Sequence, residues 1–112
     1  MVNEQKLDEV LLQLGHDDFC RGTAQLRVAV KRYTPGMAMT KELYPALAAA
    51  LDTSPARVER NIRHAIEKAW ARNDFDTQRR FFGGSVNPAT GRPTVGEYVA
   101  HLHRLCSEGM TY

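Results

Sequence analysis

The chain has 112 residues, of which 43% are hydrophobic and 25% charged, with a formal net charge of +2. This length suits one domain that buries a core without disulfides or metal ions. No apolar run approaches the 18 or so residues that a membrane span needs, and the N-terminus lacks the apolar centre of a signal peptide. We therefore expect a cytoplasmic protein with no membrane partner.

The charge is distributed unevenly. Residues 1–20 contain five acidic side chains and one lysine, a net charge of −4, so residues 21–112 carry +6. Between positions 54 and 72, five basic residues stand against two acidic ones, a local net charge of +3. That charge is enough for a phosphate-binding surface, but too small for a chain that coats nucleic acid indiscriminately.

The spacing of apolar residues predicts helices and no convincing strand in the first half of the chain. A short amphipathic helix over residues 7–14 stops at Gly15, and a second helix covers residues 23–33. The stretch Thr34-Pro-Gly36 ends the second helix. A third helix, Leu43 to Leu51, is rich in alanine, and its small side chains would let a neighbouring helix approach closely.

The fourth predicted helix, residues 55–71, has the clearest local signals. Ser54 is a good N-cap, and Pro55 fits the first helical position, where its missing N–H costs nothing. Apolar residues recur at helical spacing and share one side, namely Val58, Ile62, Ala65, Ile66 and Ala69. A tight turn joins this helix to the third one, and the pair is predicted to form a helix-turn-helix over about residues 43–72.

The side of the fourth helix opposite its apolar stripe is basic. It carries Arg57, Arg60 and His64, with Asn61 and Lys68 close by and Glu59 and Arg63 on the flanks. A helix that is buried on one side and offers arginines and an acid on the other is what a reader of the DNA major groove needs. For an arbitrary amphipathic helix, a solvated charged face is the more frequent explanation. In this chain the local positive charge favours a DNA-binding face over a solvated one.

Two further helices complete the predicted domain. Asp74 is placed to cap a fifth helix that runs toward Phe81-Phe82 and ends at Gly83-Gly84, and residues 85–93 form a loop. Thr94 caps a sixth helix, with Glu97 as its capping-box partner. The aromatic cluster of Phe75, Phe81 and Phe82 suits a core better than a stacking platform.

Other chemistry is weakly represented. His101 and His103 are two apart on a helix and so face different directions, which makes them poor metal partners. Cys20 and Cys106 lie outside any metal-ligand spacing, which favours small buried thiols. No serine has a base and an acid arranged around it, and Gly83-Gly84 lacks the lysine and spacing of a phosphate loop. We expect no enzyme, no cofactor and no metal site.

Several stretches form a pattern too specific to arise from helix propensity alone. The main ones are Thr40-Lys-Glu-Leu-Tyr-Pro45, Arg57-Val-Glu-Arg60, Ile62-Arg-His-Ala-Ile-Glu67 and Ala69-Trp70. Shorter ones are Gly15, Arg21-Gly22, Leu26-Arg27, Phe82-Gly83 and Pro93-Thr94 with Glu97. Together, from about Leu7 to Leu105, they closely resemble the DNA-binding domain of stage zero sporulation protein A, the master response regulator of endospore-forming bacteria.

The resemblance implies an all-α effector domain of six helices, winged-helix-like but without a sheet, that binds a short box in double-stranded DNA through its fourth helix. The family positions that match Arg57, Glu59 and Arg60 read bases. Arginine can bond to guanine O6 and N7, and glutamate can accept from cytosine N4. Asn61 replaces a small apolar residue of the family pattern and is placed to read adenine.

The same resemblance, together with charge, predicts the phosphate contacts. We expect these from Ser54, Arg63, His64, Lys68, Arg21 and Arg92. Where the family pattern has a histidine before Arg21-Gly22, this chain has Phe19, which would remove one backbone contact.

The organisation of the chain leads to two hypotheses about function. We expect residues 1–112 to form a single domain without the phosphoacceptor receiver of the family, and hence to bind DNA without a phosphorylation switch. The first hypothesis is a sequence-specific transcription regulator, which self-associates on tandem sites if the bound domains touch. The alternative is a helical interaction module that acts on RNA polymerase or a full-length relative. Arg79 and Arg80 would serve an acidic partner or DNA equally well, whereas the intact Arg57, Glu59 and Arg60 set favours the regulator.

Overall fold

The computed structural model describes residues 2–83 and 91–107, and these contain six α-helices. The helices are α1 (Glu4–Gln13), α2 (Arg21–Arg32), α3 (Tyr44–Ala50), α4 (Pro55–Arg72), α5 (Phe75–Phe82) and α6 (Val95–Cys106). Extended pairing in the described part amounts to one isolated bridge between Val2 and Ser107. The predicted all-α class without a sheet is confirmed.

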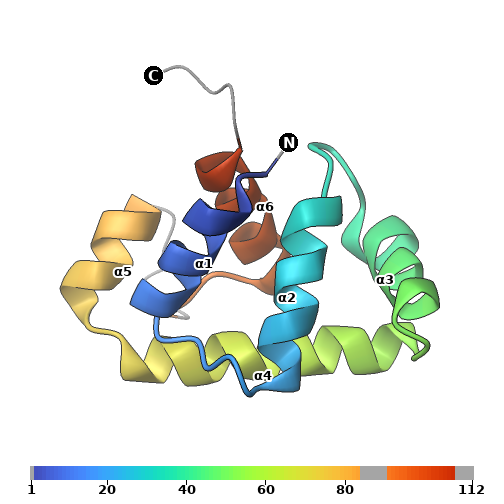
Figure 1. The fold of residues 1–112 in the computed structure, drawn as a ribbon, viewed down its shortest axis with the longest axis horizontal. Helices are drawn as coiled ribbons and strands as arrows, with labels where there is room; N and C mark the ends of the chain where they lie inside the picture. The colour runs from blue at the N-terminus through green and yellow to red at the C-terminus, as the bar shows by residue number, and fades with distance from the viewer. Residues whose placement is uncertain (1, 84–90, 108–112) are drawn as a thin grey trace.

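Helix α4 is the longest element, and the others are arranged to one side of it. In Figure 1 it runs along the lower edge, with α1, α3 and α6 above it and the start of α2 crossing it. At 18 residues it is roughly 27 Å long. Apart from the start of α2, no described helix lies along the lower side of α4 in Figure 1.

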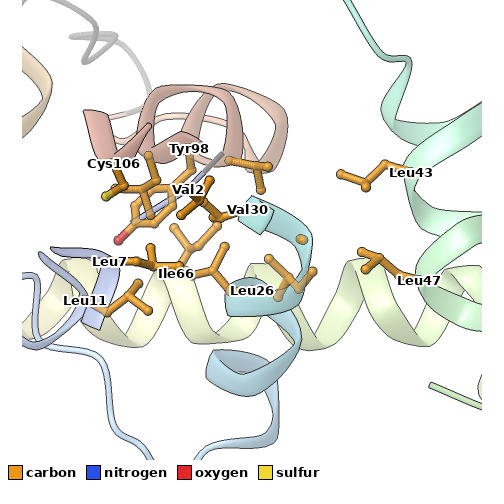
Figure 2. Close-up of a cluster of buried hydrophobic side chains, with 14 of the residues drawn as sticks. Val2, Leu7, Leu11, Leu26, Val30, Leu43, Leu47, Ile66, Tyr98 and Cys106 are labelled. Atoms are coloured by element: carbon orange, nitrogen blue, oxygen red, sulfur yellow. The ribbon is translucent and has the colours of Figure 1, made fainter. Parts of the chain in front are cut away.

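The core lies where α1, α2, α4 and α6 meet and continues to α3. Figure 2 shows Leu7, Leu26, Ile66 and Tyr98 converging from these four helices, while Leu47 extends the cluster from α3. The five residues that sequence spacing assigned to the inner side of α4 are all at most 2% exposed. Val58 and Ile62 are completely buried, and α4 packs against α3. The orientation predicted for α4 is therefore confirmed.

Side chains cap three of the helices where the sequence predicted. The Arg57 N–H donates to the Ser54 hydroxyl over 3.2 Å, which begins α4. Asp74 accepts from the Thr77 N–H at 2.8 Å and begins α5. At α6 both hydrogen bonds of the Thr94 and Glu97 capping box are present. These contacts satisfy N–H groups that a helix would otherwise leave unpaired.

The third predicted helix differs from expectation at its start. It is preceded by a π-helical turn, η1 (Met39–Leu43), in which the Leu43 N–H donates to the Ala38 carbonyl over 3.0 Å. Pro45 is the physical reason, because its ring lacks an N–H and would clash with the carbonyl four residues earlier. The wider turn leaves room for that ring before α3 continues.

Two other packing predictions were wrong in part. Of the α3 alanines, only Ala48 is buried, whereas Ala46, Ala49 and Ala50 are exposed, so three of the four do not lie between helices. In the aromatic cluster Phe82 is buried and Phe81 half-buried, but Phe75 is 67% exposed because it lies on the outer side of α5. The predicted helix end at Gly84 and residues 85–90 of the predicted loop lie outside the described residues.

Candidate nucleic-acid interface

The exposed side of α4 has a basic central stripe. Arg57, Arg60, His64 and Lys68 are all exposed there. Their spacing of three, four and four residues places them along one side of the helix. The stripe is roughly 16 Å long, since a helix rises about 1.5 Å per residue. A positive stripe on an exposed helix matches the width and charge of a DNA major groove.

On one side of this stripe, α2 begins directly against α4. A Cβ added to Gly22 would lie 2.1 Å from the Asn61 carbonyl oxygen, so the two backbones touch. Arg21, at the first position of α2, is exposed next to this contact. Asn61 is half-buried at the same crossing. The α2 side therefore brings Arg21 and Asn61 to one edge of the stripe.

On the other side of the stripe, the cations are held in ion pairs. The Arg63 Nε lies 2.9 Å from Glu59, and the Arg92 Nη2 lies 2.8 Å from Glu67. The four side chains keep between 33% and 45% of their surface exposed, so each pair contributes little stability. Such pairs can exchange a carboxylate for a phosphate at little cost.

Glu59, Arg63 and Arg92 border a groove of about 610 Å³ between η1, α4 and the start of α6. Its lining includes Tyr44, Glu59, Arg63, Arg92 and Thr94. Burial, and then the nearby Glu59 carboxylate, raise the pKa of Tyr44 to about 12. The tyrosine hydroxyl is therefore protonated at neutral pH, and the groove combines two guanidinium groups with neutral donors.

The predicted site residues thus fall into three groups. The central stripe holds Arg57, Arg60, His64 and Lys68, the α2 side holds Arg21 and Asn61, and the α6 side holds Glu59, Arg63 and Arg92. Ser54 lies at the N-terminus of α4, where its hydroxyl caps the helix. Glu59 is directed toward Arg63 rather than toward Arg57 or Arg60.

This arrangement has a counterpart among known protein families. The family model for the C-terminal domain of the sporulation initiation factor Spo0A matches residues 7–105. The chain belongs to this family. Its members are bacterial DNA-binding domains that regulate transcription in sporulation, so this sporulation-factor domain is a DNA-binding regulatory domain and not a member of a catalytic family. The resemblance that the sequence predicted from about Leu7 to Leu105 is confirmed.

Two residues of the sporulation-factor domain that were not assigned from sequence lie at this interface. Glu67 is the carboxylate that pairs with Arg92, and the Trp70 Nε1–H donates to the Gly91 carbonyl over 2.6 Å. A half-buried indole N–H requires an acceptor, so the tryptophan itself was the signal available for a polar partner, although none was predicted. Nothing local identified Gly91 as that partner, because 21 positions separate the two residues.

One polar pair is buried away from the interface. His16, between α1 and α2, lies with its Nε2 2.7 Å from the Tyr98 hydroxyl of α6. Burial, followed by the charges of Arg27 and Arg72, lowers the pKa of His16 to about 4. Burial also raises the pKa of Tyr98. At neutral pH both groups are uncharged, and the pair joins the α1–α2 connection to α6 within the core.

The remaining histidines and cysteines have structural surroundings. His103 contacts the Val30 carbonyl through Nδ1 at 2.8 Å, and His101 contacts the Phe81 carbonyl while stacking on Phe82. Cys106 is buried, which raises the pKa of its thiol, and Cys20 is only half-buried. Within residues 2–83 and 91–107, no three histidine, cysteine or acidic side chains come together in a metal-ligating group. None of the described helices is long and apolar enough to cross a membrane.

Proposed function

We propose that this domain is a sequence-specific transcription regulator that places α4, residues 55–71 above all, in the major groove of double-stranded DNA. The observation that carries the proposal is the exposed stripe of Arg57, Arg60, His64 and Lys68 on the side of α4 that, apart from the start of α2, no described helix covers. Membership of a DNA-binding family supports it.

Base reading in this proposal comes from the first two turns of α4. Arg57 and Arg60 are exposed and donate to guanine O6 and N7. Glu59 accepts from cytosine N4 at the groove edge, and in the free protein it orients Arg63. Asn61 reads adenine from the α2 side, where the contact with Gly22 fixes its backbone.

Phosphates of the two strands are held on the two sides of α4. On the α2 side we assign Arg21, with Lys68 and His64 along the stripe. On the α6 side we assign Arg63 and Arg92, whose ion pairs are exposed enough to exchange. Ser54 contributes a hydroxyl at the N-terminus of α4, where the helix dipole favours an anion.

The test compares one predicted base reader with one predicted phosphate ligand. A randomised duplex library, bound at stated salt, gives the preferred sequence. Arg60→Ala is expected to weaken binding to that sequence about 5- to 150-fold and random duplex much less, because it removes a base contact of roughly 1–3 kcal/mol. Lys68→Ala is expected to weaken both duplexes equally. Equal losses from Arg60→Ala on both duplexes would show that α4 does not read sequence as proposed.

A second function is favoured by one feature of α5. Phe75 is 67% exposed, and the Arg79 guanidinium carbon lies 5.7 Å from the centre of its ring. Aromatic residues and arginine are enriched at protein interfaces, and we propose RNA polymerase as the partner here. Phe75→Ala should then reduce transcription from a bound promoter while DNA affinity stays the same. Self-association on DNA is tested separately, by comparing affinity for duplexes with one and with two adjacent boxes.

A further inference from the structure

Residues 91–94 lie along α4 and are attached to it at two points. The Gly91 carbonyl accepts from the Trp70 indole N–H at 2.6 Å, and the Arg92 guanidinium pairs with Glu67 at 2.8 Å. Glu67 and Trp70 are three positions apart on α4, so they are neighbours on its surface. Together they hold residues 91 and 92, which are distant in sequence. The segment continues through the buried Pro93 to the N-cap of α6.

We propose that Glu67 and Trp70 are positioning residues that hold Arg92 at the edge of the DNA-binding side of α4. This inference rests on the function proposed above. Arg92 then joins Arg63, which lines the same groove, to form the phosphate-binding side opposite α2. Glu67 lies four residues after Arg63 on α4, so the two arginines reach the groove from adjacent points.

The physical advantage is preorganisation. A long, flexible arginine loses rotamer freedom when it binds a phosphate, and that loss opposes binding. Here the backbone of residue 91 is fixed by the indole, and the guanidinium of residue 92 is already oriented by a carboxylate. The Arg92 side chain is 45% exposed, so a phosphate can take the place of the Glu67 carboxylate while the guanidinium keeps much of its orientation.

The experiment measures duplex affinity over a series of salt concentrations. Arg92→Ala should make the negative slope of log affinity against log salt shallower by about 0.9 and weaken binding about 5-fold at 0.15 M salt, because one phosphate contact is lost. Trp70→Phe keeps an aromatic ring against Phe82 and removes the indole N–H. In the wild-type background it should shift the slope and the affinity toward the values of Arg92→Ala. In an Arg92→Ala background it should change neither quantity much, because the side chain that it positions is already gone.

Two variants separate positioning from simple charge or stability effects. Arg32→Ala also removes one positive charge, but Arg32 lies at the C-terminal end of α2, whereas α2 contacts α4 near its N-terminal end. This control should leave the slope unchanged. Arg92→Lys keeps the charge and should recover part of the slope. Glu67→Gln removes repulsion between Glu67 and DNA, so its effect is compared with and without Arg92. A difference between those two backgrounds is the coupling that positioning predicts.

The outcomes distinguish this inference from the proposed function. If the wild-type domain shows no duplex preference and no salt dependence, the proposed function fails. If the wild type binds as proposed but Arg92→Ala behaves like Arg32→Ala, only the inference fails. It also fails if Trp70→Phe or Glu67→Gln changes the duplex affinity and its salt slope by the same amount whether or not Arg92 is present. If Trp70→Phe does not fold, the inference is tested by comparing the effect of Glu67→Gln in the wild-type and Arg92→Ala backgrounds.

Discussion

The two sides of α4 are built in different ways, and two glycines show the contrast. On the α2 side, a Cβ added to Gly22 would lie 2.1 Å from the Asn61 carbonyl oxygen and 2.8 Å from the Ala65 Cβ. On the α6 side, a Cβ added to Gly96 would lie 3.2 Å from the Cγ of Met39, at the end of the groove beside α4. The first glycine meets backbone that cannot move alone, and the second meets a flexible side chain.

This difference implies that the two sides contribute differently to DNA binding. The α2 side fixes the position of Arg21 and Asn61 through contact between backbones. The α6 side holds Arg63 and Arg92 through exposed ion pairs that a phosphate can replace. We therefore expect substitutions on the α2 side to change the stability of the fold. Substitutions of the paired arginines on the α6 side should mainly change the salt dependence of binding.

The largest effect is expected from Gly22→Ala. Alanine favours helices by about 1 kcal/mol over glycine, so the change would stabilise an unobstructed position. Here the added Cβ forces α2 away from Asn61, and overpacking of this kind costs about 3 kcal/mol. Urea unfolding should show a correspondingly lower free energy of unfolding. A stable Gly22→Ala variant would mean that the two helices can separate freely and that the contrast between the two sides is false.

The second largest effect is the loss of folding stability at low pH, which tests the burial of His16 in the core near the start of α2. The pKa of His16 falls from its ordinary 6.5 to about 4 in the folded chain, so the unfolded chain binds a proton first as pH falls. The stability of the fold is therefore unaffected by this group above pH 6.5 and declines between 6.5 and 4. At pH 5 the loss should be on the order of 2 kcal/mol.

Urea unfolding at pH 7 and at pH 5 measures this loss. His16→Gln, which keeps a polar group near the Tyr98 hydroxyl, serves as the control, because it cannot titrate in this range. Its stability should change less between the two pH values. An equal change in wild type and variant would show that another group is responsible.

Local signals allowed most of α4 to be predicted from sequence. Ser54, Pro55 and the apolar stripe lie within 17 residues, and each acts through near neighbours. The π-helical turn before α3 was missed, because bonds to the fifth preceding residue leave no periodic apolar pattern. Pro45 was the available signal, since its ring demands space on the preceding turn.

The interface was predictable to a similar extent and for the same reason. The exposed stripe follows from helical spacing alone, so Arg57, Arg60 and His64 were placed on one side correctly. The contact between Glu67 and Arg92 joins residues 25 positions apart and depends on how α6 returns to α4. The close approach at Gly22 likewise depends on the crossing of two helices. Gly22, just before the start predicted for the second helix, was the one hint of it, because a glycine permits close approach of another backbone.

The smallest effect is expected from Gly96→Ala, the counterpart of Gly22→Ala on the α6 side. The new Cβ meets only the Met39 side chain, at 3.2 and 3.9 Å, and a methionine has three rotatable bonds with which to move away. The gain in helix propensity should then outweigh the crowding, and the free energy of unfolding should rise by about 0.5 kcal/mol, less than the full difference because residue 96 lies in the first turn of α6. Duplex affinity and its salt slope should stay at wild-type values, because neither ion pair is touched. A loss of stability as large as that of Gly22→Ala would mean that the groove side is as rigid as the α2 side, and Arg92 would then need no anchoring by Glu67 and Trp70.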